Sequence, residues 1–297
     1  MTTDNLAQQT WKRFRRSRLA VAAVVYVVAI AIVAALAPFL ANANPVVIGS
    51  LSFRPLVPYS PNAIHLPGRL QPPGDGHLLG TDDLGRDVLA RIIHGARISL
   101  AVGFLATALS LVVGSILGAL AGYYGGAIDW IVSRLIEVVL CFPFLFLVLA
   151  IVALFRPSLT TIMIALGLTS WTTEARYVRG EFLRIREMEF AYAARASGAS
   201  DSRIIFRHLL PNAFAPVLVS ASFGVAFAIL TESALSFLGV GVPLPMASWG
   251  SILSVAQQFM DYAWWLVVFP GVAIFTTVVA FNIIGDRLRD ALDPRAD

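Results

Sequence analysis

The chain has 297 residues, of which 58% are hydrophobic and only 13% are Asp, Glu, Lys or Arg, and its mean hydropathy is +0.77. Soluble domains carry about 25% charged residues, so this composition excludes an ordinary soluble domain and indicates a membrane protein. The net charge of +4 does not indicate nucleic-acid binding, because the basic residues gather at the ends of apolar segments, where membrane topology requires them. The single cysteine, Cys141, rules out an internal disulfide, and its apolar surroundings predict a small buried side chain.

Six apolar segments have the length of membrane spans, since about 20 residues cross ~30 Å of hydrocarbon in a helix. We therefore expect an all-α polytopic membrane protein with six transmembrane helices. Basic residues precede the first segment, but its apolar run exceeds the ~7–15 residues of a signal peptide, so we interpret it as a retained anchor. The segments are Leu19–Ala41, Ile98–Tyr123, Ile131–Phe155, Leu159–Tyr177, Pro211–Leu238 and Tyr262–Gly285.

The positions of the arginines predict which ends of these segments face the cytoplasm. Residues 176–207 are rich in arginine, whereas residues 239–261 contain neither Lys nor Arg, so both termini are expected in the cytoplasm. The predicted organisation is a cytoplasmic N-terminus at 1–18, a first transmembrane helix at 19–41, an extracytoplasmic loop at 42–97, a core of five transmembrane helices at 98–286 with a polar cytoplasmic loop at 187–210, and a cytoplasmic tail at 287–297.

The extracytoplasmic loop has two parts. Its first half is rich in Pro, Gly and Asn, which is typical of a compact loop without regular secondary structure. Its second half, residues 87–97, has apolar residues at helical spacing and predicts a short interfacial helix that leads into the second segment. The tryptophans near the expected membrane boundaries are interpreted as interfacial anchors, namely Trp249, Trp264 and Trp265.

Small residues recur every four positions in the second segment. This spacing places them on one face of a helix, where they allow the backbone of another helix to approach closely. The residues are Ser110, Gly114, Gly118 and Gly122.

The sequence lacks the motifs of common catalytic sites. A P-loop requires G-x-x-x-x-G-K-[ST], whereas the only lysine, Lys12, is followed by Arg13. The four histidines lack metal-ligand spacing, and the acidic residues near Gly85 do not fit a calcium loop. We therefore expect a protein that is not an enzyme, with no catalytic residue, metal or cofactor of its own.

The polar stretch EFAYAARASGASDSRIIFRHLLPN, residues 189–212, interrupts the apolar sequence. Good helix formers precede Gly198, which suits a helix C-terminus with positive φ, and Ser200 and Asp201 suit the N-terminus of a following helix. The second helix reaches Leu210-Pro211, where the fifth segment begins. The pattern predicts two short helices joined by a glycine corner. A rigid elbow of this kind transmits a movement of its first helix to the fifth segment. An amphipathic loop on the lipid surface is the alternative.

This stretch resembles the "EAA" loop of ABC importer permeases. The family pattern is Glu-Ala-Ala, three residues, Gly, nine residues, Ile, one residue and Leu-Pro; here Tyr192 replaces the Glu and His208 replaces the Ile. In that family the loop forms a coupling helix that docks into the ATP-hydrolysing subunit. The resemblance implies a type I ABC importer permease fold and assigns ATPase coupling to Glu189, Tyr192, Ala193, Ala194, Gly198, Ser200, Arg203, Leu210 and Pro211.

Two further stretches resemble one subgroup, the oligopeptide, dipeptide and nickel permeases, and the early anchor resembles its C-type subunit. They are GTDDLGRD at residues 80–87 and ESALSFLGVG at residues 232–241, the latter followed by Ser248-Trp249-Gly250. The first stretch is a candidate contact for an external binding protein or a self-satisfied turn. Its candidate residues are Thr81, Asp82, Asp83, Arg86 and Asp87.

Two acidic residues lie within apolar segments, where a charge is expected to face protein or water. Glu232 is a candidate for the translocation pathway or a gate, and equally for a structural cap of neighbouring backbone. Glu174 poses the same question in the fourth segment, and the family pattern does not assign it a role.

The resemblance implies that the chain works within a larger assembly in a bacterial or archaeal cytoplasmic membrane. The expected partners are a homologous second permease, two ABC ATPase subunits or domains that hold ATP and Mg²⁺, an extracytoplasmic substrate-binding protein and the lipid membrane. Di- or oligopeptides are the expected cargo, and nickel or another small solute is the alternative. A secondary transporter driven by an ion gradient would require intramembrane acidic or histidine relays and matched halves, which the sequence lacks. A membrane scaffold would require no coupling elbow.

Overall fold

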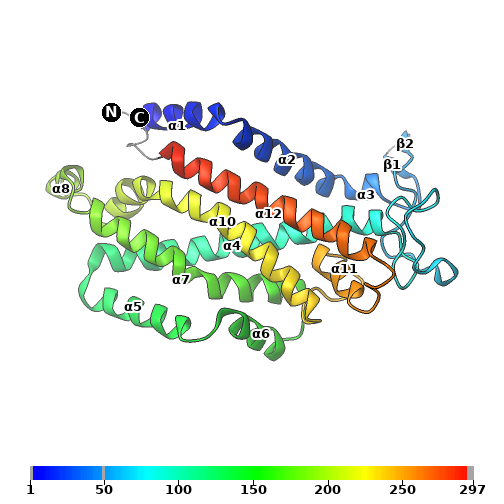
Figure 1. The fold of residues 1–297 in the computed structure, drawn as a ribbon. Coiled ribbons are helices and arrows are strands. Elements are labelled where there is room, and N and C mark those ends of the chain that lie inside the picture. The colour runs from blue at the N-terminus through cyan, green and yellow to red at the C-terminus, as the bar shows by residue number, and fades with distance from the viewer. Residues whose placement is uncertain (1–2, 49–50, 293–297) are drawn as a thin grey trace.

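The computed structural model describes residues 3–48 and 51–292. Long helices run side by side, and the elements at the two ends of the bundle differ (Figure 1). The helices are α1 (Thr3–Arg16), α2 (Arg18–Ala35), α3 (Ala37–Leu40), α4 (Val88–Tyr124), α5 (Gly126–Leu140), α6 (Phe144–Leu154), α7 (Leu159–Ile185), α8 (Glu189–Ala196), α9 (Asp201–Arg203), a π-helical turn (Ile204–Leu209), α10 (Leu210–Phe237), α11 (Trp249–Ala256) and α12 (Trp265–Leu292).

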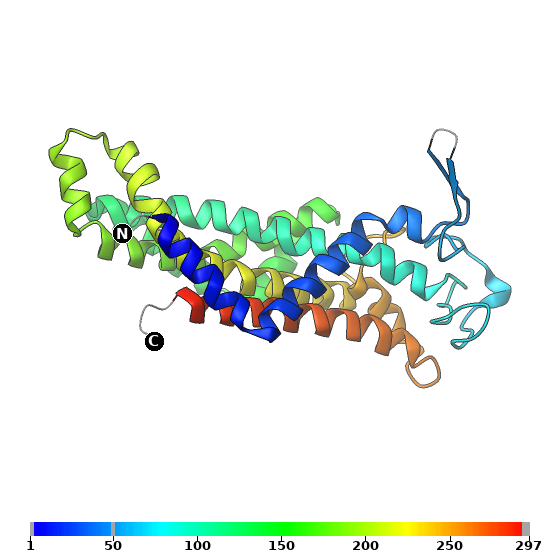
Figure 2. The ribbon, with the colours of Figure 1, turned by 90° about the horizontal axis from the view of Figure 1, so that it is seen from above.

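Among the described residues, the regular secondary structure is helical except for one short hairpin. Strands β1 (Val46–Ile48) and β2 (Leu51–Phe53) pair antiparallel, with Val46 opposite Phe53. The hairpin and the loop that follows it extend from one end of the bundle, and α8 extends from the other (Figure 2). The all-α prediction therefore needs this small correction in the external loop.

In the part of the chain that the structure describes, four helices are long and apolar enough to cross a membrane: α2, α4, α12 and the Pro216–Phe237 part of α10. Helices α5 and α6 form a fifth span if they are counted together, although they are bent by 87° at the break that contains Pro143. Helix α7 is 27 residues long but carries Glu174, Arg176 and Arg179 within it, so its composition alone does not identify it as a span.

Three predicted boundaries differ from the observed helices. Residues 87–97 are not a separate interfacial helix, because the backbone continues without a break from Val88 through Tyr124. The first segment ends early at Ala35, and the short α3 follows with Pro38 near its start, since proline cannot donate the next helical hydrogen bond. The last helix continues to Leu292, beyond the predicted end at Gly285.

The predicted stripe of small residues packs α4 against α7. A Cβ added at Gly114 would lie 2.5 Å from the Cβ of Glu174, and one added at Gly118 would lie 2.5 Å from the Ala175 carbonyl oxygen. Gly122 faces Phe182 in the same way. The prediction of a close helix approach is therefore confirmed, and this contact positions α7 and the loop that follows it.

Two predictions about single side chains are wrong. Cys141 is exposed rather than buried, because it lies at the bend between α5 and α6. Trp249 and Trp265 are buried, and their indole N–H groups donate to the carbonyl oxygens of Ile92 and Thr81 at 3.1 and 3.0 Å. Of the three tryptophans, Trp264 is the exposed one, at 52%.

Candidate functional site

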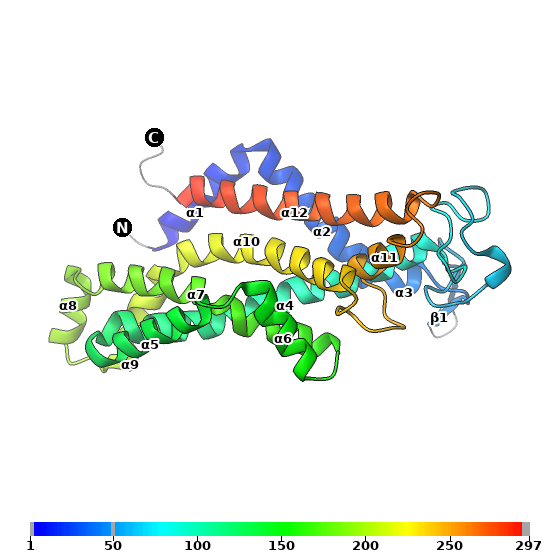
Figure 3. The same cartoon turned by 60° about the horizontal axis from the view of Figure 1, so that its bottom comes forward.

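The polar loop forms a helical elbow at one end of the bundle, the end where both chain termini also lie (Figures 1 and 3). Helix α8 ends before Gly198, whose φ is +75°, and the chain then turns into α9. Helix α9 continues through the π-helical turn into α10, so the second arm of the elbow is rooted in a membrane helix. The predicted glycine corner is therefore confirmed.

The π-helical turn was not expected from the sequence. Pro211 lacks an N–H group, and its ring would press against the carbonyl of Arg207 in a regular α-helix. The N–H of Leu210 donates instead to the carbonyl of Ile205, five residues back. The Leu-Pro pair was the signal for this irregularity, because proline within a continuous helix requires an adjustment before it.

A hydrophobic core holds the elbow against the bundle. Ala191 of α8 and Ile204 and Leu209 of the second arm are fully buried, and they pack with Phe182 and Ile185 of α7. Burial of this apolar surface contributes stability in proportion to its area. The elbow is therefore part of the folded body.

Polar contacts also connect the elbow to α4. The Tyr123 hydroxyl donates to an Asp201 carboxylate oxygen at 2.7 Å, and the Arg195 guanidinium lies 5.4 Å from the centre of the Tyr123 ring. On α8, the Tyr192 hydroxyl donates to Glu187 at 2.6 Å, and this bond, together with Arg186, lowers the pKa of the Glu187 carboxyl. These contacts orient α8 relative to two long helices.

The predicted coupling residues fall into an exposed and a packed group. Glu189, Tyr192 and Ala193 are exposed on α8, and Gly198, Ser200, Arg203 and Pro211 are exposed along the turn and second arm. Ala194 and Leu210 are partly buried against the core of the elbow. Ser200 occupies the N-cap position of α9 without a side-chain capping bond; its hydroxyl lies 3.4 Å from that of Ser202. The exposed α8 face is therefore the surface available to a partner.

The GTDDLGRD loop is mostly buried at the opposite end of the molecule. Asp82 accepts from the Arg86 guanidinium at 2.7 Å and lies 3.4 Å from that of Arg91, while the Thr81 hydroxyl donates to the Gly68 carbonyl at 2.6 Å. Asp87 caps α4 by accepting from the Ala90 N–H at 2.7 Å, and it also lies 2.8 Å from a His77 nitrogen. These contacts favour the self-satisfied turn.

Only one of the predicted binding-protein contacts keeps a substantially accessible side chain. The side chain of Asp83 is 30% exposed, whereas those of Asp82, Arg86 and Asp87 are almost fully buried. The contact with an external protein stays a prediction for this loop, and Asp83 is the residue of the five that can make it directly.

Glu232 joins three helices in a buried polar cluster. One of its carboxylate oxygens accepts from the Ser236 hydroxyl of α10 and from the Ser248 hydroxyl at the start of α11, both at 2.7 Å. The next residue, Trp249, donates its backbone N–H to the Ser99 hydroxyl of α4 at 3.1 Å. Glu232 is fully buried, so this arrangement favours the structural interpretation over a gate.

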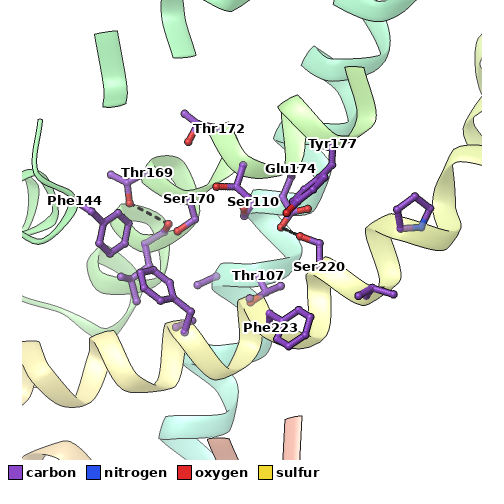
Figure 4. Close-up of a pocket in the computed structure, with 18 of the residues that line it drawn as sticks. Thr107, Ser110, Phe144, Thr169, Ser170, Thr172, Glu174, Tyr177, Ser220 and Phe223 are labelled. Atoms are coloured by element: carbon purple, nitrogen blue, oxygen red, sulfur yellow. Dashed lines mark hydrogen bonds between the residues drawn. The ribbon is translucent and has the colours of Figure 1, made fainter. Parts of the chain in front are cut away.

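A cavity of about 1150 Å³ lies between α4, the bent α5–α6 pair, α7 and α10 (Figure 4). Hydroxyl side chains from three helices line it together with aromatic rings, and Glu174 of α7 accepts from the Ser220 hydroxyl of α10 at 2.7 Å. Sequence reasoning singled out Glu174 but missed the hydroxyl residues as a lining. The signal was a hydroxyl-rich run within the apolar fourth segment. The labelled hydroxyl residues are Thr107, Ser110, Thr169, Ser170, Thr172 and Ser220.

The fold and the elbow define a class of protein: a helical membrane transport subunit in which helix α8 is exposed at one end of the bundle. Comparison with known proteins identifies the family. Residues 114–297 match the family described as binding-protein-dependent transport system inner membrane component, and residues 5–73 match the N-terminal TM domain of oligopeptide transport permease C. The chain belongs to this family of inner-membrane transport components.

Several curated relatives are similar along nearly their whole length. The dipeptide transport system permease protein DppC of Alkalihalophilus pseudofirmus is 41% identical over 97% of this chain and 90% of the relative. The oligopeptide transport system permease protein OppC of Bacillus subtilis is 37% identical over 96% of this chain and 90% of the relative. The chain is thus a multi-pass inner membrane permease subunit of a bacterial ABC importer.

The solved structures show likeness at the level of the fold. An inward-facing structure of the MetNI methionine ABC transporter is 22% identical, with a TM-score of 0.56 over 69% of this chain and 97% of that chain. The helical bundle is therefore similar to that of an ABC importer permease.

Proposed function

We propose that this chain forms half of the pathway by which an ATP-driven importer carries di- or oligopeptides across the cytoplasmic membrane. The support for peptides is the high identity to a dipeptide permease over 97% of the chain. The relatives described above carry peptide names, and this favours peptides over the alternative cargo, nickel.

The topology that fits this role has six spans and both termini in the cytoplasm. Helix α7, at ~1.5 Å per residue, is about 40 Å long and packs along α4, so it serves as the span that composition alone does not identify. The elbow and the termini then share the cytoplasmic side, and the loop between α3 and α4 lies outside, where a substrate-binding protein delivers cargo.

The observation that carries the proposal is the exposed α8, joined through a continuous helical arm to α10. A second, homologous permease completes the pathway, and two ATPase subunits, which hold ATP and Mg²⁺, grip α8 of each permease. Closure of the ATPase pair on ATP moves α8, and the buried contacts of the elbow pass that movement to α7 and α10.

Reconstitution of the importer in proteoliposomes tests this function. The chain, its partner permease, the ATPase subunits and the binding protein are assembled, and uptake of radiolabelled dipeptide is measured with ATP and without it. We expect uptake that requires both ATP and the binding protein, and that disappears when residues 189–207 are deleted. Uptake by this chain alone, driven by an ion gradient, would contradict the proposal.

A further inference from the structure

Glu174 is a buried carboxylate without a counter-ion, more than halfway along α7. It is 5% exposed; one oxygen accepts from the Ser220 hydroxyl at 2.7 Å, and the other, Oε2, has no hydrogen-bond partner among the described residues. A lone charge at this depth of a membrane protein is costly, and such residues usually face a pathway or pair with another charge. Its position therefore requires an explanation.

The packing of α4 and α7 positions this carboxylate at the cavity. Gly114 of α4 leaves the space that the Glu174 side chain crosses, since a Cβ there would lie 2.5 Å from the Glu174 Cβ. Glu174 lines the cavity, with hydroxyl groups around it (Figure 4). The hydroxyl of Thr107, which also lines the cavity, is likewise buried and without a partner. Two unsatisfied polar groups thus lie in the same wall.

Two arginines also line the cavity, Arg184 of α7 and Arg289 of α12, but neither forms an ion pair with Glu174 among the described residues. The other carboxylate that lines the cavity, Glu181, pairs with Arg184 one turn further along α7. Glu232, the second buried acid, also has one oxygen without a partner among the described residues, but its other oxygen accepts from two hydroxyls and it does not line the cavity. Glu174 is therefore the lining carboxylate that lacks a basic partner within the part of the chain described.

We propose that Glu174 binds a cationic side chain of the peptide in transit, above all the side-chain ammonium of lysine. An ammonium supplies three hydrogen-bond donors and one positive charge, which complement Oε2 and the neighbouring hydroxyls. Oε2 is closed off from solvent in this conformation, so rotation of the carboxylate or displacement of the Ser220 hydroxyl presents it to the cargo. This inference rests on the proposed peptide transport and names the charge preference of its pathway.

The test compares uptake of Ala-Lys with uptake of Ala-Glu by the reconstituted importer. In Glu174→Gln we expect the Ala-Lys to Ala-Glu ratio to fall roughly fivefold, as loss of one ion pair of about 1 kcal/mol in a partly hydrated site predicts. Glu174→Asp keeps the charge and is expected to retain the preference. Because one binding protein serves all variants, its own selectivity cancels when their ratios are compared.

Two further variants keep the test decisive. Glu137→Gln removes an exposed carboxylate of α5 that pairs with Arg134 and does not line the cavity, so we expect the ratio to stay unchanged. Glu174→Ala removes the carboxylate together with its bond from Ser220 and is expected to lower the ratio as Glu174→Gln does; it decides the question if Glu174→Gln does not assemble. An unchanged ratio in the assembled variant that lacks the carboxylate, in a complex with ATP-dependent uptake, would overturn this inference alone. Absence of ATP-dependent uptake in the wild type would overturn the proposed function as well.

Discussion

At the scale of single residues, the glycines of α4 determine the helix packing as much as the larger side chains do. Gly114, Gly118 and Gly122 allow α4 to touch the backbone of α7, and this contact fixes the position of Glu174 and of the elbow. The spacing of these residues was visible in the sequence. The identity of the facing helix was not, because a four-residue repeat describes one surface and says nothing of its partner.

The first prediction concerns this contact. Gly114→Ala adds a Cβ that would lie 2.5 Å from the Glu174 Cβ and 2.7 Å from the Trp171 carbonyl oxygen, so we expect a loss of about 1–3 kcal/mol from overpacking. Thermal unfolding of the purified complex measures it. Gly180→Ala on α7 is the control, since a Cβ there meets nothing within 4 Å. Equal melting temperatures for the two variants would argue against the close contact.

A second prediction separates the two interpretations of Glu232. Glu232→Gln weakens the bond from Ser236 within α10 and the bond from Ser248 that joins α10 to α11, and a hydrogen bond to a charged group is worth about 1.5–3 kcal/mol. We expect the melting temperature to fall, while the uptake per correctly assembled complex stays near that of the wild type. If stability were unchanged and uptake lost, Glu232 would belong to the pathway.

At the scale of elements, the elbow was the most predictable part of the site. Gly198, the acidic start of the second arm and the Leu-Pro pair all follow local rules that a sequence displays. The buried contacts of Ala191 with α7 and the bond from Tyr123 to Asp201 were not predictable, because they join segments far apart in the chain. For the same reason the cavity was missed: its lining comes from separate helices, and the hydroxyl-rich run of α7 does not show which helices face it.

The third prediction belongs to the elbow. Gly198 has φ of +75° and no atom close to an added Cβ, so Gly198→Val carries only the cost of a left-handed backbone, about 1–2 kcal/mol. We expect the complex to assemble but ATP-dependent uptake to fall, because α8 is aimed differently. Gly198→Asn is the matched control, since asparagine tolerates this conformation. Full uptake by the valine variant would count against a rigid elbow.

At the scale of the whole molecule, the two ends of the bundle differ in structure. The elbow and both termini lie at one end, and the hairpin and the GTDDLGRD loop lie at the other (Figure 1). The sequence predicted this division through its arginine distribution, although it misjudged the start of α4.

The fourth prediction tests the orientation of these ends. In a Cys141→Ser background, single cysteines replace Ala193 on α8 and Leu56 in the external loop, both of which are exposed. A membrane-impermeant maleimide is expected to label position 56 in right-side-out vesicles and position 193 only in inside-out vesicles. The reverse pattern would invert the proposed topology.

The central proposal is that the ATPase subunits bind α8, and site-specific photo-crosslinking tests this contact most directly. A photoreactive amino acid is placed at Ala193 in the assembled importer, with Leu56 as the control position at the opposite end. We predict a crosslink from position 193 to an ATPase subunit, with a yield that changes when ATP is added, and none from position 56. Crosslinks from position 193 to lipid alone would contradict the account.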